Sequence, residues 1–184
     1  PLGDATGHCS SAPLRGKKGN EYEGGMRVPF IASWAKPDSR TPQQKKLPIQ
    51  AGVIQQQLGT VMDIYPTVLA VTGTKLPKNH VIDGCNLIPQ LLGQKNEARP
   101  ERFLMHFPHA HRGSYFTVYR DGDWKLIYYY NPKLPNRPAY ELYNLKKDPN
   151  EIYNVATLET EQLKEMVKAM AGQLEAEGAL YPID

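Results

Sequence analysis

Residues 13–31 read PLRGKKGNEYEGGMRVPFI, in which basic residues, four glycines and an acidic pair come just before an apolar run. Glycines lie on both sides of Lys17 and Lys18. Glycine adopts positive φ and lets the backbone approach a ligand closely, which residues with a Cβ resist. A lysine in such a loop can act as a point charge on an oxyanion. The stretch therefore predicts a loop that delivers a fixed positive charge to an anion.

The apolar run from Val28 to Trp34 is typical of a short buried strand in a mainly parallel sheet. Such sheets bind their ligands in the loops where strands end. We therefore expect an α/β fold in which the loop that contains the two lysines opens at the end of a strand.

The second half of the chain contains four short runs that are rich in aromatic and β-branched residues. The second and third runs are separated by Asp121-Gly122-Asp123, a turn signal in which Gly122 supplies positive φ. We expect the four runs to form a small antiparallel sheet, with strands at residues 102–107, 115–120, 124–130 and 140–143.

Helices are predicted in three places. Apolar residues spaced three to four apart between Thr160 and Glu177 indicate an amphipathic helix that covers one face of the antiparallel sheet. The segment 63–71 has helical spacing with a proline in its first turn, and Gly73 ends it. A short helical turn is expected over residues 87–93. Within this chain the predicted fold is therefore α+β.

Composition limits the classes of protein and partner. With 184 residues, 40% of them hydrophobic, the chain can form one domain with a core, or a piece of a larger fold plus a small subdomain. The net charge is +3, and the sequence lacks the dense lysine and arginine runs that indicate nucleic-acid binding. Two cysteines support neither a disulfide framework nor a zinc site. No membrane-spanning run and no signal peptide are visible, so we expect neither a nucleic-acid nor a membrane partner.

The segment LRGKKGNEYEGGMRVPFIASW resembles the signature of the sulfatases, which belong to the alkaline-phosphatase-like superfamily. Further segments resemble downstream parts of the same family, so that essentially the whole chain is covered: VMDIYPTVLAVTGTKLP, IDGCNLIPQLLGQ, YFTVYRDGDWKLIYYY and YELYNLKKDPNEIYNVA. The resemblance implies an α/β enzyme of which this chain is the C-terminal part. Residues 1–98 would be the end of the catalytic sheet domain, and residues 99–184 a small subdomain with a four-stranded antiparallel sheet and a C-terminal helix.

The resemblance also assigns chemistry to particular residues. The signature lysine of sulfatases contacts the sulfate group, and it corresponds to Lys18, which we expect to be catalytic; Lys17 stands where the family usually has a second glycine. Sulfatases use a formylglycine, made from the Cys or Ser of a Cys/Ser-x-Pro-x-Arg site, and a calcium ion. Neither Cys9 nor Cys85 lies in such a site. The resemblance therefore implies that formylglycine and calcium are both supplied from outside this chain, which alone should be inactive.

Histidines supply the candidate substrate ligands, because imidazole is a proton donor or an anion partner near neutral pH. His106, His109 and His111 lie within six residues of one another. A strand that ends there would present His106 or His109 to the pocket that Lys18 faces, and we expect these two to bind substrate. The alternative is a turn with imidazoles that face solvent or are satisfied in the core. His8, in the opening loop, is a further candidate for lining the pocket.

Other charged residues are better explained by structural roles. Arg15 and Arg27 are expected to pair with Glu21 or Glu23, and His80 is expected at the surface. Three aspartates fit helix-capping or turn roles better than metal ligation: Asp63, Asp83 and Asp148. We therefore expect no metal ligand in this chain.

The leading functional hypothesis is hydrolysis of sulfate esters, on a sulfated saccharide or an aryl sulfate, as the resemblance implies. One alternative is a phosphodiesterase or phosphonate hydrolase of the same superfamily, and another is a non-catalytic binding module. The residues that precede Pro1 would separate the three, because they would contain the nucleophile and the metal ligands. By family resemblance we expect the remainder of the sulfatase polypeptide as a partner, and a periplasmic or secreted location.

Overall fold

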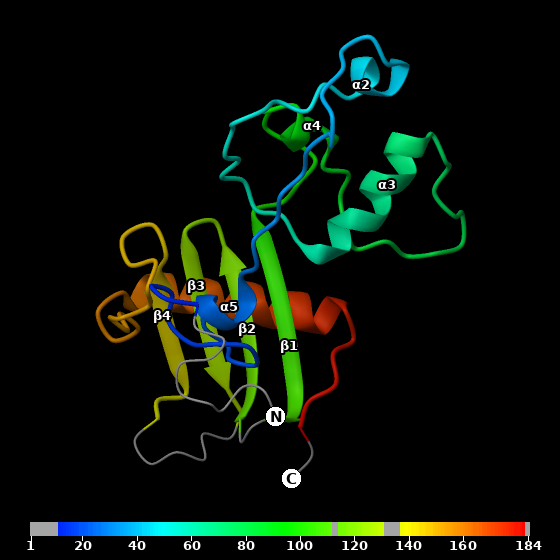
Figure 1. The fold of residues 1–184 in the computed structure, drawn as a ribbon. Coiled ribbons are helices and arrows are strands. Elements are labelled where there is room, and N and C mark those ends of the chain that lie inside the picture. The colour runs from blue at the N-terminus through cyan, green and yellow to red at the C-terminus, as the bar shows by residue number, and fades with distance from the viewer. Residues whose placement is uncertain (1–10, 112–113, 131–136, 183–184) are drawn as a thin grey trace. The chain divides into compact units, whose positions relative to one another are not determined.

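The computed structural model describes residues 11–111, 114–130 and 137–182 (Figure 1). Their contacts divide the chain into two compact units. One unit contains the described residues up to Val28 and from Arg102 onward, and the other is Pro29–Glu101. The loop that contains Lys18 thus belongs to the same unit as the C-terminal part of the chain. The division of the intact protein into domains 1–98 and 99–184 stays a prediction.

The first unit contains the antiparallel sheet that the sequence predicts. Its strands follow one another in the order β1-β2-β3-β4, and each pairs antiparallel with the next. Gly122 has a φ of 56° in the turn between the second and third strands, which confirms the predicted turn. The strands are β1 (Arg102–His111), β2 (Ser114–Asp121), β3 (Trp124–Tyr129) and β4 (Tyr140–Asn144).

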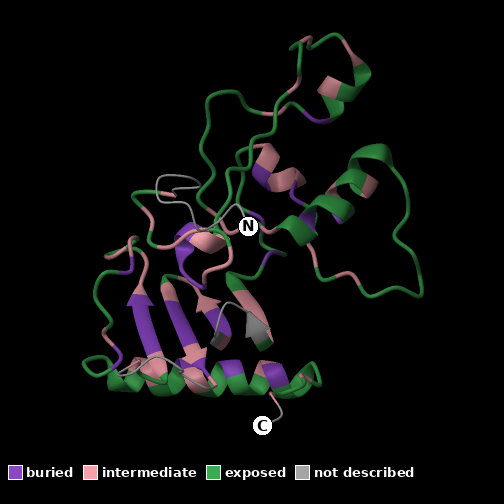
Figure 2. Ribbon diagram, turned by 60° about the horizontal axis from the view of Figure 1, so that its bottom comes forward, coloured by how far each residue is buried: buried purple, intermediate pink, exposed green. Residues whose placement is uncertain are grey.

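Helix α5 (Thr160–Ala176) covers one face of this sheet, as predicted. In Figure 2 the buried residues of α5 lie on the side of the helix that faces the strands. Met166, Met170 and Leu174 are buried there, and they pack with alternate residues of the inner strands. One side of the helix, whose residues recur every three to four positions, therefore packs on one face of the sheet, whose residues recur every two. A core between a helix and a sheet is usually closed in this way.

The opposite face of the sheet is covered by the segment 11–28, which includes the short helix α1 (Glu23–Met26) (Figure 1, blue). Tyr22 is the centre of this contact and is buried. It packs with residues from all three strands β2, β3 and β4: Phe116, Val118, Ile127, Tyr129 and Tyr143. The apolar ring of Tyr22 thus attaches the loop of the two lysines to the sheet.

The second unit is built from short helices joined by long connections. The helix predicted over 63–71 is confirmed, and Gly73 ends it with a φ of 71°. The predicted turn over 87–93 is confirmed as a one-turn helix. The elements are α2 (Pro42–Lys46), the 3-10 helix η1 (Val61–Asp63), α3 (Ile64–Thr72) and α4 (Ile88–Leu91). None of the described helices has the length and apolarity needed to cross a membrane.

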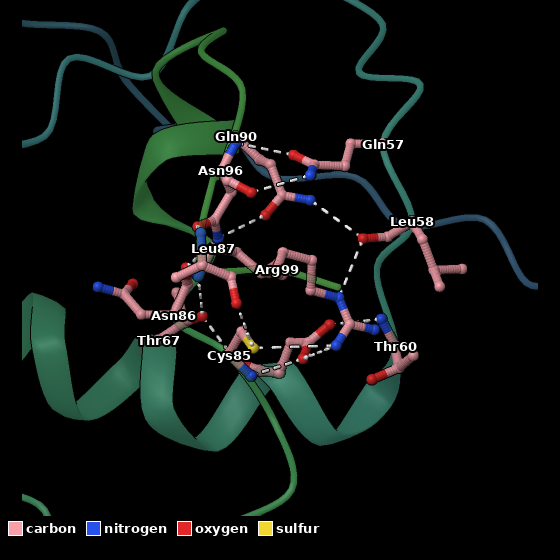
Figure 3. Close-up of polar contacts among 12 residues, drawn as sticks. Gln57, Leu58, Thr60, Thr67, Cys85, Asn86, Leu87, Gln90, Asn96 and Arg99 are labelled. Carbon is pink, nitrogen blue, oxygen red and sulfur yellow. Dashed lines mark hydrogen bonds and ion pairs between the residues drawn. The ribbon is translucent and has the colours of Figure 1, made fainter. Parts of the chain in front are cut away.

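A buried aspartate organises this second unit. Asp63 accepts hydrogen bonds from the backbone N–H of Thr60, at 2.6 Å, and of Cys85, at 2.8 Å, and it pairs with Arg99 at 3.4 Å. Figure 3 shows the guanidinium of Arg99 between Cys85 and the carbonyl of Leu58, to which it donates at 3.3 Å. The capping role predicted for Asp63 is confirmed, because its carboxylate accepts the backbone N–H of Thr60 at the start of the 3-10 helix.

The buried parallel strand predicted from Val28 to Trp34 is wrong for this structure. The backbone has no regular secondary structure there, and Val28 and Ile31 are 78% and 87% exposed. A strand exists only when its backbone N–H and C=O groups pair with a neighbour. The described strands pair only with one another in the antiparallel sheet, so this apolar run has no strand to join among the described residues.

Candidate functional site

Lys18 lies at the tip of a tight turn that runs from Lys17 to Asn20. The backbone N–H of Asn20 donates to the carbonyl of Lys17 at 2.9 Å. Gly16 and Gly19 have φ angles of 85° and 87°, which confirms the predicted need for positive φ on both sides of the lysines. Lys18 is exposed, and within the described part of the chain it forms no ion pair. Its ammonium group is therefore available to an external anion.

Gly24 and Gly25, which follow the turn, allow the backbone of residues 14–20 to pack closely on helix α1. A Cβ built on Gly24 would lie 2.5 Å from the carbonyl oxygen of Arg15. A Cβ on Gly25 would lie 2.7 Å from the carbonyl oxygen of Lys17 and would overlap the carbonyl of Asn20. The backbone of the turn thus lies directly on helix α1, and a side chain at either glycine would push the two apart.

Beneath the loop, Lys125 of β3 is buried between two carboxylates. Its Nζ is 3.0 Å from Glu23 Oε1 and 2.7 Å from Glu151 Oε1. Glu151 Oε2 also accepts the backbone N–H of Glu23 at 2.6 Å. Burial raises the pKa of Glu151 above its ordinary value, and the adjacent Lys125 ammonium opposes that change. The group links α1 to the sheet through charge as well as apolar contact.

Arg15 takes part in a second network, which is partly buried. It donates to the hydroxyl of Tyr143 at 3.0 Å and to the carbonyl of Glu151 at 2.8 Å, and its guanidinium lies 3.8 Å from the centre of the Tyr22 ring. The expectation that Arg15 pairs with Glu21 or Glu23 is therefore wrong. Its guanidinium instead donates to a tyrosine hydroxyl and a backbone carbonyl. Burial raises the pKa of Tyr22 and of Tyr143, so both hydroxyls remain protonated donors.

The remaining acidic residues of the loop are also held by the sheet. Glu21 accepts a hydrogen bond from the hydroxyl of Tyr129 at 2.7 Å and forms an ion pair with Arg137. Arg27 pairs with Glu23 at 3.9 Å, as predicted. Among the described residues, the other charged side chains of the loop therefore have structural partners, whereas the ammonium groups of Lys17 and Lys18 have none.

The two histidines predicted to bind substrate lie on opposite faces of the sheet. The imidazole of His109 is exposed and lies against the ring of Phe107, with ring centres 4.2 Å apart. Phe107 packs against the core cluster that includes Tyr22, so His109 shares a face with the loop of the two lysines. His106 shares the α5 face with Leu104, which packs with α5, because successive side chains of a strand alternate.

Both ring nitrogens of His106 are hydrogen-bonded within the unit. Nδ1 is 2.8 Å from the hydroxyl of Thr117, and Nε2 donates to the carbonyl of Leu180 at 2.6 Å, since a carbonyl oxygen only accepts. The rings of Tyr130 and Tyr181 contact its imidazole edge to face. These contacts match the alternative in which the imidazole is satisfied within the fold.

The remaining residues that the sequence singled out have surface or turn positions, or lie outside the described residues. His80 is exposed, which confirms the surface prediction. Asp148 accepts the backbone N–H of Tyr153 at 2.9 Å, as its predicted turn role requires. His8 and the side chain of His111 lie outside the described residues. In the described ranges, no three His, Cys, Asp or Glu side chains are arranged to hold a metal ion.

Sequence reasoning missed the residues that hold the loop in place. Lys125 and Glu151 lie in segments with no charge pattern that sets them apart, and they meet only when the first 28 residues pack on the sheet. Asn20 could have been found, because a glycine followed by asparagine after two lysines is a turn signal.

Comparisons with known proteins show what this chain is similar to. Residues 17–179 match the family model for the N-sulphoglucosamine sulphohydrolase C-terminal region. The chain is 33% identical to mouse steryl-sulfatase over 129 residues, which is 70% of this chain and 19% of that protein. It is 32% identical to human arylsulfatase A over 193 aligned positions, which cover 92% of this chain and 35% of that protein.

A solved structure provides a similar fold. The crystal structure of Ps i-CgsB in complex with k-i-k-neocarrahexaose superposes with a TM-score of 0.64 and 27% identity, over 88% of this chain and 32% of that one. The chain therefore spans between about a fifth and a third of the length of these proteins.

Proposed function

This chain belongs to the family of N-sulphoglucosamine sulphohydrolase C-terminal regions, within the sulfatases, and from this premise we propose that it works in an enzyme that hydrolyses sulfate esters of carbohydrates. The observation that carries the proposal is the exposed Lys18 at the tip of a turn that is itself anchored to the sheet. Relatives named as sulfatases support the sulfate ester. A structural relative crystallised with an oligosaccharide supports a carbohydrate substrate.

In this proposal Lys18 acts as a fixed cation. Its ammonium group would contact an oxygen of the sulfate group, where negative charge shifts as the ester bond breaks. A placed charge lowers the barrier most when it needs no reorganisation at the moment of reaction. The buried partners of the neighbouring acidic residues serve this purpose, because no carboxylate of the loop is left free to neutralise Lys18.

Neither cysteine of this chain lies in a sequence that forms formylglycine. Ser11-Ala12-Pro13-Leu14-Arg15 has the Ser-x-Pro-x-Arg spacing, but its Arg15 is held by the hydroxyl of Tyr143 and the carbonyl of Glu151. Cys85 is followed by Asn86 and Leu87, not by the x-Pro-x-Arg sequence that formylglycine formation requires. The described residues also contain no cluster of metal-ligating side chains. We therefore propose that both groups are supplied by the remainder of the sulfatase polypeptide, which would be the partner of this chain in a periplasmic or secreted enzyme.

His109 is the better placed of the two proposed substrate ligands. It is exposed on the face of the sheet that also carries the loop of Lys18, and its ring lies against that of Phe107. We propose that it donates a hydrogen bond to a hydroxyl or sulfate oxygen of the saccharide. His106 would have to break its bond to Leu180 to do the same.

The test is Lys18→Ala in the intact enzyme, assayed with nitrophenyl sulfate. Loss of one placed cation should lower kcat by about 100-fold or more, by analogy with removal of one oxyanion-stabilising donor. Lys17→Ala is the matched control and should cost much less. If the two effects were reversed, the neighbouring lysine would be the sulfate ligand. Hydrolysis of nitrophenyl phosphate in preference to the sulfate would instead support the phosphorus-ester alternative.

A further inference from the structure

Asn20 closes the turn that presents Lys18. Its side-chain Oδ1 accepts the backbone N–H of Lys17 at 2.9 Å, and its own backbone N–H donates to the carbonyl of Lys17 at 2.9 Å. The same two residues are therefore joined by two hydrogen bonds in opposite directions, with Lys18 and Gly19 between them. Gly19 adds the positive φ that the third position of a type II turn requires.

The surroundings of Asn20 show that this closure is built into the loop. A Cβ on Gly16 would lie 3.2 Å from the Cβ of Asn20, so the asparagine side chain lies close against that glycine. On the other side, the carbonyl of Asn20 faces Gly25 with no room for a Cβ. Within the described residues, the amide of Asn20 is the only side-chain group that hydrogen-bonds to the backbone of residues 16–19.

We propose that Asn20 is a positioning residue for the reaction, which acts through Lys18. This inference rests on the proposed function. A lysine side chain has a flexible four-carbon stem, so its ammonium reaches a fixed point reliably only when its Cα is fixed. A double hydrogen bond between the residues on either side of Lys18 and Gly19 fixes that Cα. A misplacement of about 1 Å by a residue that does not touch the substrate can cost about 100-fold in rate.

The experiment is a double-mutant cycle in the intact enzyme with nitrophenyl sulfate as substrate. Asn20→Ala alone should lower kcat at least about tenfold, because the ammonium of Lys18 is no longer held in place. In the Lys18→Ala background, the same change should alter kcat less than about twofold, because the residue through which it acts is gone. Equal effects in both backgrounds would overturn the inference.

Two further variants separate positioning from general damage. Asn20→Ser keeps an uncharged oxygen acceptor for the N–H of Lys17 and should retain most of kcat. Asn20→Leu, which has a similar shape but no acceptor, should behave like Asn20→Ala, and it replaces that variant if Asn20→Ala does not fold. If Asn20→Ser were as slow as Asn20→Leu, the acceptor would not be the active feature and the proposal would fail.

A matched control is available in the same unit. Asn144 also accepts a backbone N–H with its Oδ1, from Lys147 at 3.1 Å, but in a turn after β4. Asn144→Ala should leave kcat unchanged. A silent Lys18→Ala would refute the proposed role of Lys18 and this inference together. A slow Lys18→Ala combined with a normal Asn20→Ala would refute only the role of Asn20.

Discussion

Gly24 and Gly25 show how single residues in this loop serve packing more than flexibility. Neither has a positive φ, yet a Cβ at each would meet a backbone carbonyl of the preceding turn. The conformational freedom of glycine is used at Gly16 and Gly19, whereas its small size is used at the pair. One short segment therefore uses glycine for two different physical reasons.

His109 allows a prediction about substrate selectivity. In the intact enzyme, His109→Ala should lower kcat/KM for a sulfated saccharide at least about tenfold, roughly one charge-assisted hydrogen bond. Turnover of an aryl sulfate should change less, because that substrate lacks the saccharide groups that the imidazole would bind. The measurement is kcat/KM on both substrates for the variant and the wild type.

Two other histidines are the controls for this prediction. His80→Ala changes an exposed residue of the other unit and should have no effect. His106→Ala removes the bond to Leu180, so any loss should be similar on both substrates and accompanied by lower thermal stability. A normal kcat/KM for His109→Ala on the saccharide would leave His109 as a surface residue.

At the level of elements, charge ties α1 to β3. Lys125 is fully buried and holds Glu23 of α1 and Glu151 of the segment after β4. A buried ion pair adds little net stability over an apolar pair, but removing one partner leaves the other charge buried and uncompensated. Here the loss would leave two carboxylates facing each other.

We therefore predict that Lys125→Met destabilises the protein by about 3–5 kcal/mol, as measured by denaturant-induced unfolding. Lys146→Met removes an exposed lysine in the turn after β4, which lies 3.9 Å from Asp123, and it should cost less than about 1 kcal/mol. Equal free energies of unfolding for the two variants would mean that the buried lysine does not hold α1 on the sheet.

For the whole molecule, the comparisons and the structure lead to a prediction about the isolated chain. It covers 19% of mouse steryl-sulfatase and 35% of human arylsulfatase A, and its described residues contain no metal-binding cluster. The purified 184-residue chain should therefore not hydrolyse nitrophenyl or nitrocatechol sulfate. The assay compares it with the Lys18→Ala variant of the same chain. Turnover above that variant would contradict the proposal that nucleophile and metal come from elsewhere.

The sequence by itself determined the elements with a strong local period. The alternating runs of the sheet, the helix over 160–176 and the turn at Gly122 follow from side-chain spacing and glycine conformation, which depend on near neighbours. The positive φ angles at Gly16 and Gly19 were predictable for the same reason. The order of the signature residues was sufficient to point to the family that the comparisons found.

Tertiary structure alone decided which partner each residue meets. The run from Val28 to Trp34 has the composition of a strand, but it has no neighbour to pair with among the described residues. Register placed His106 on the α5 face and Phe107 on the other, and packing of the first 28 residues brought Lys125 to Glu23. These outcomes depend on contacts between residues far apart in the chain, which cannot be predicted from local periodicity.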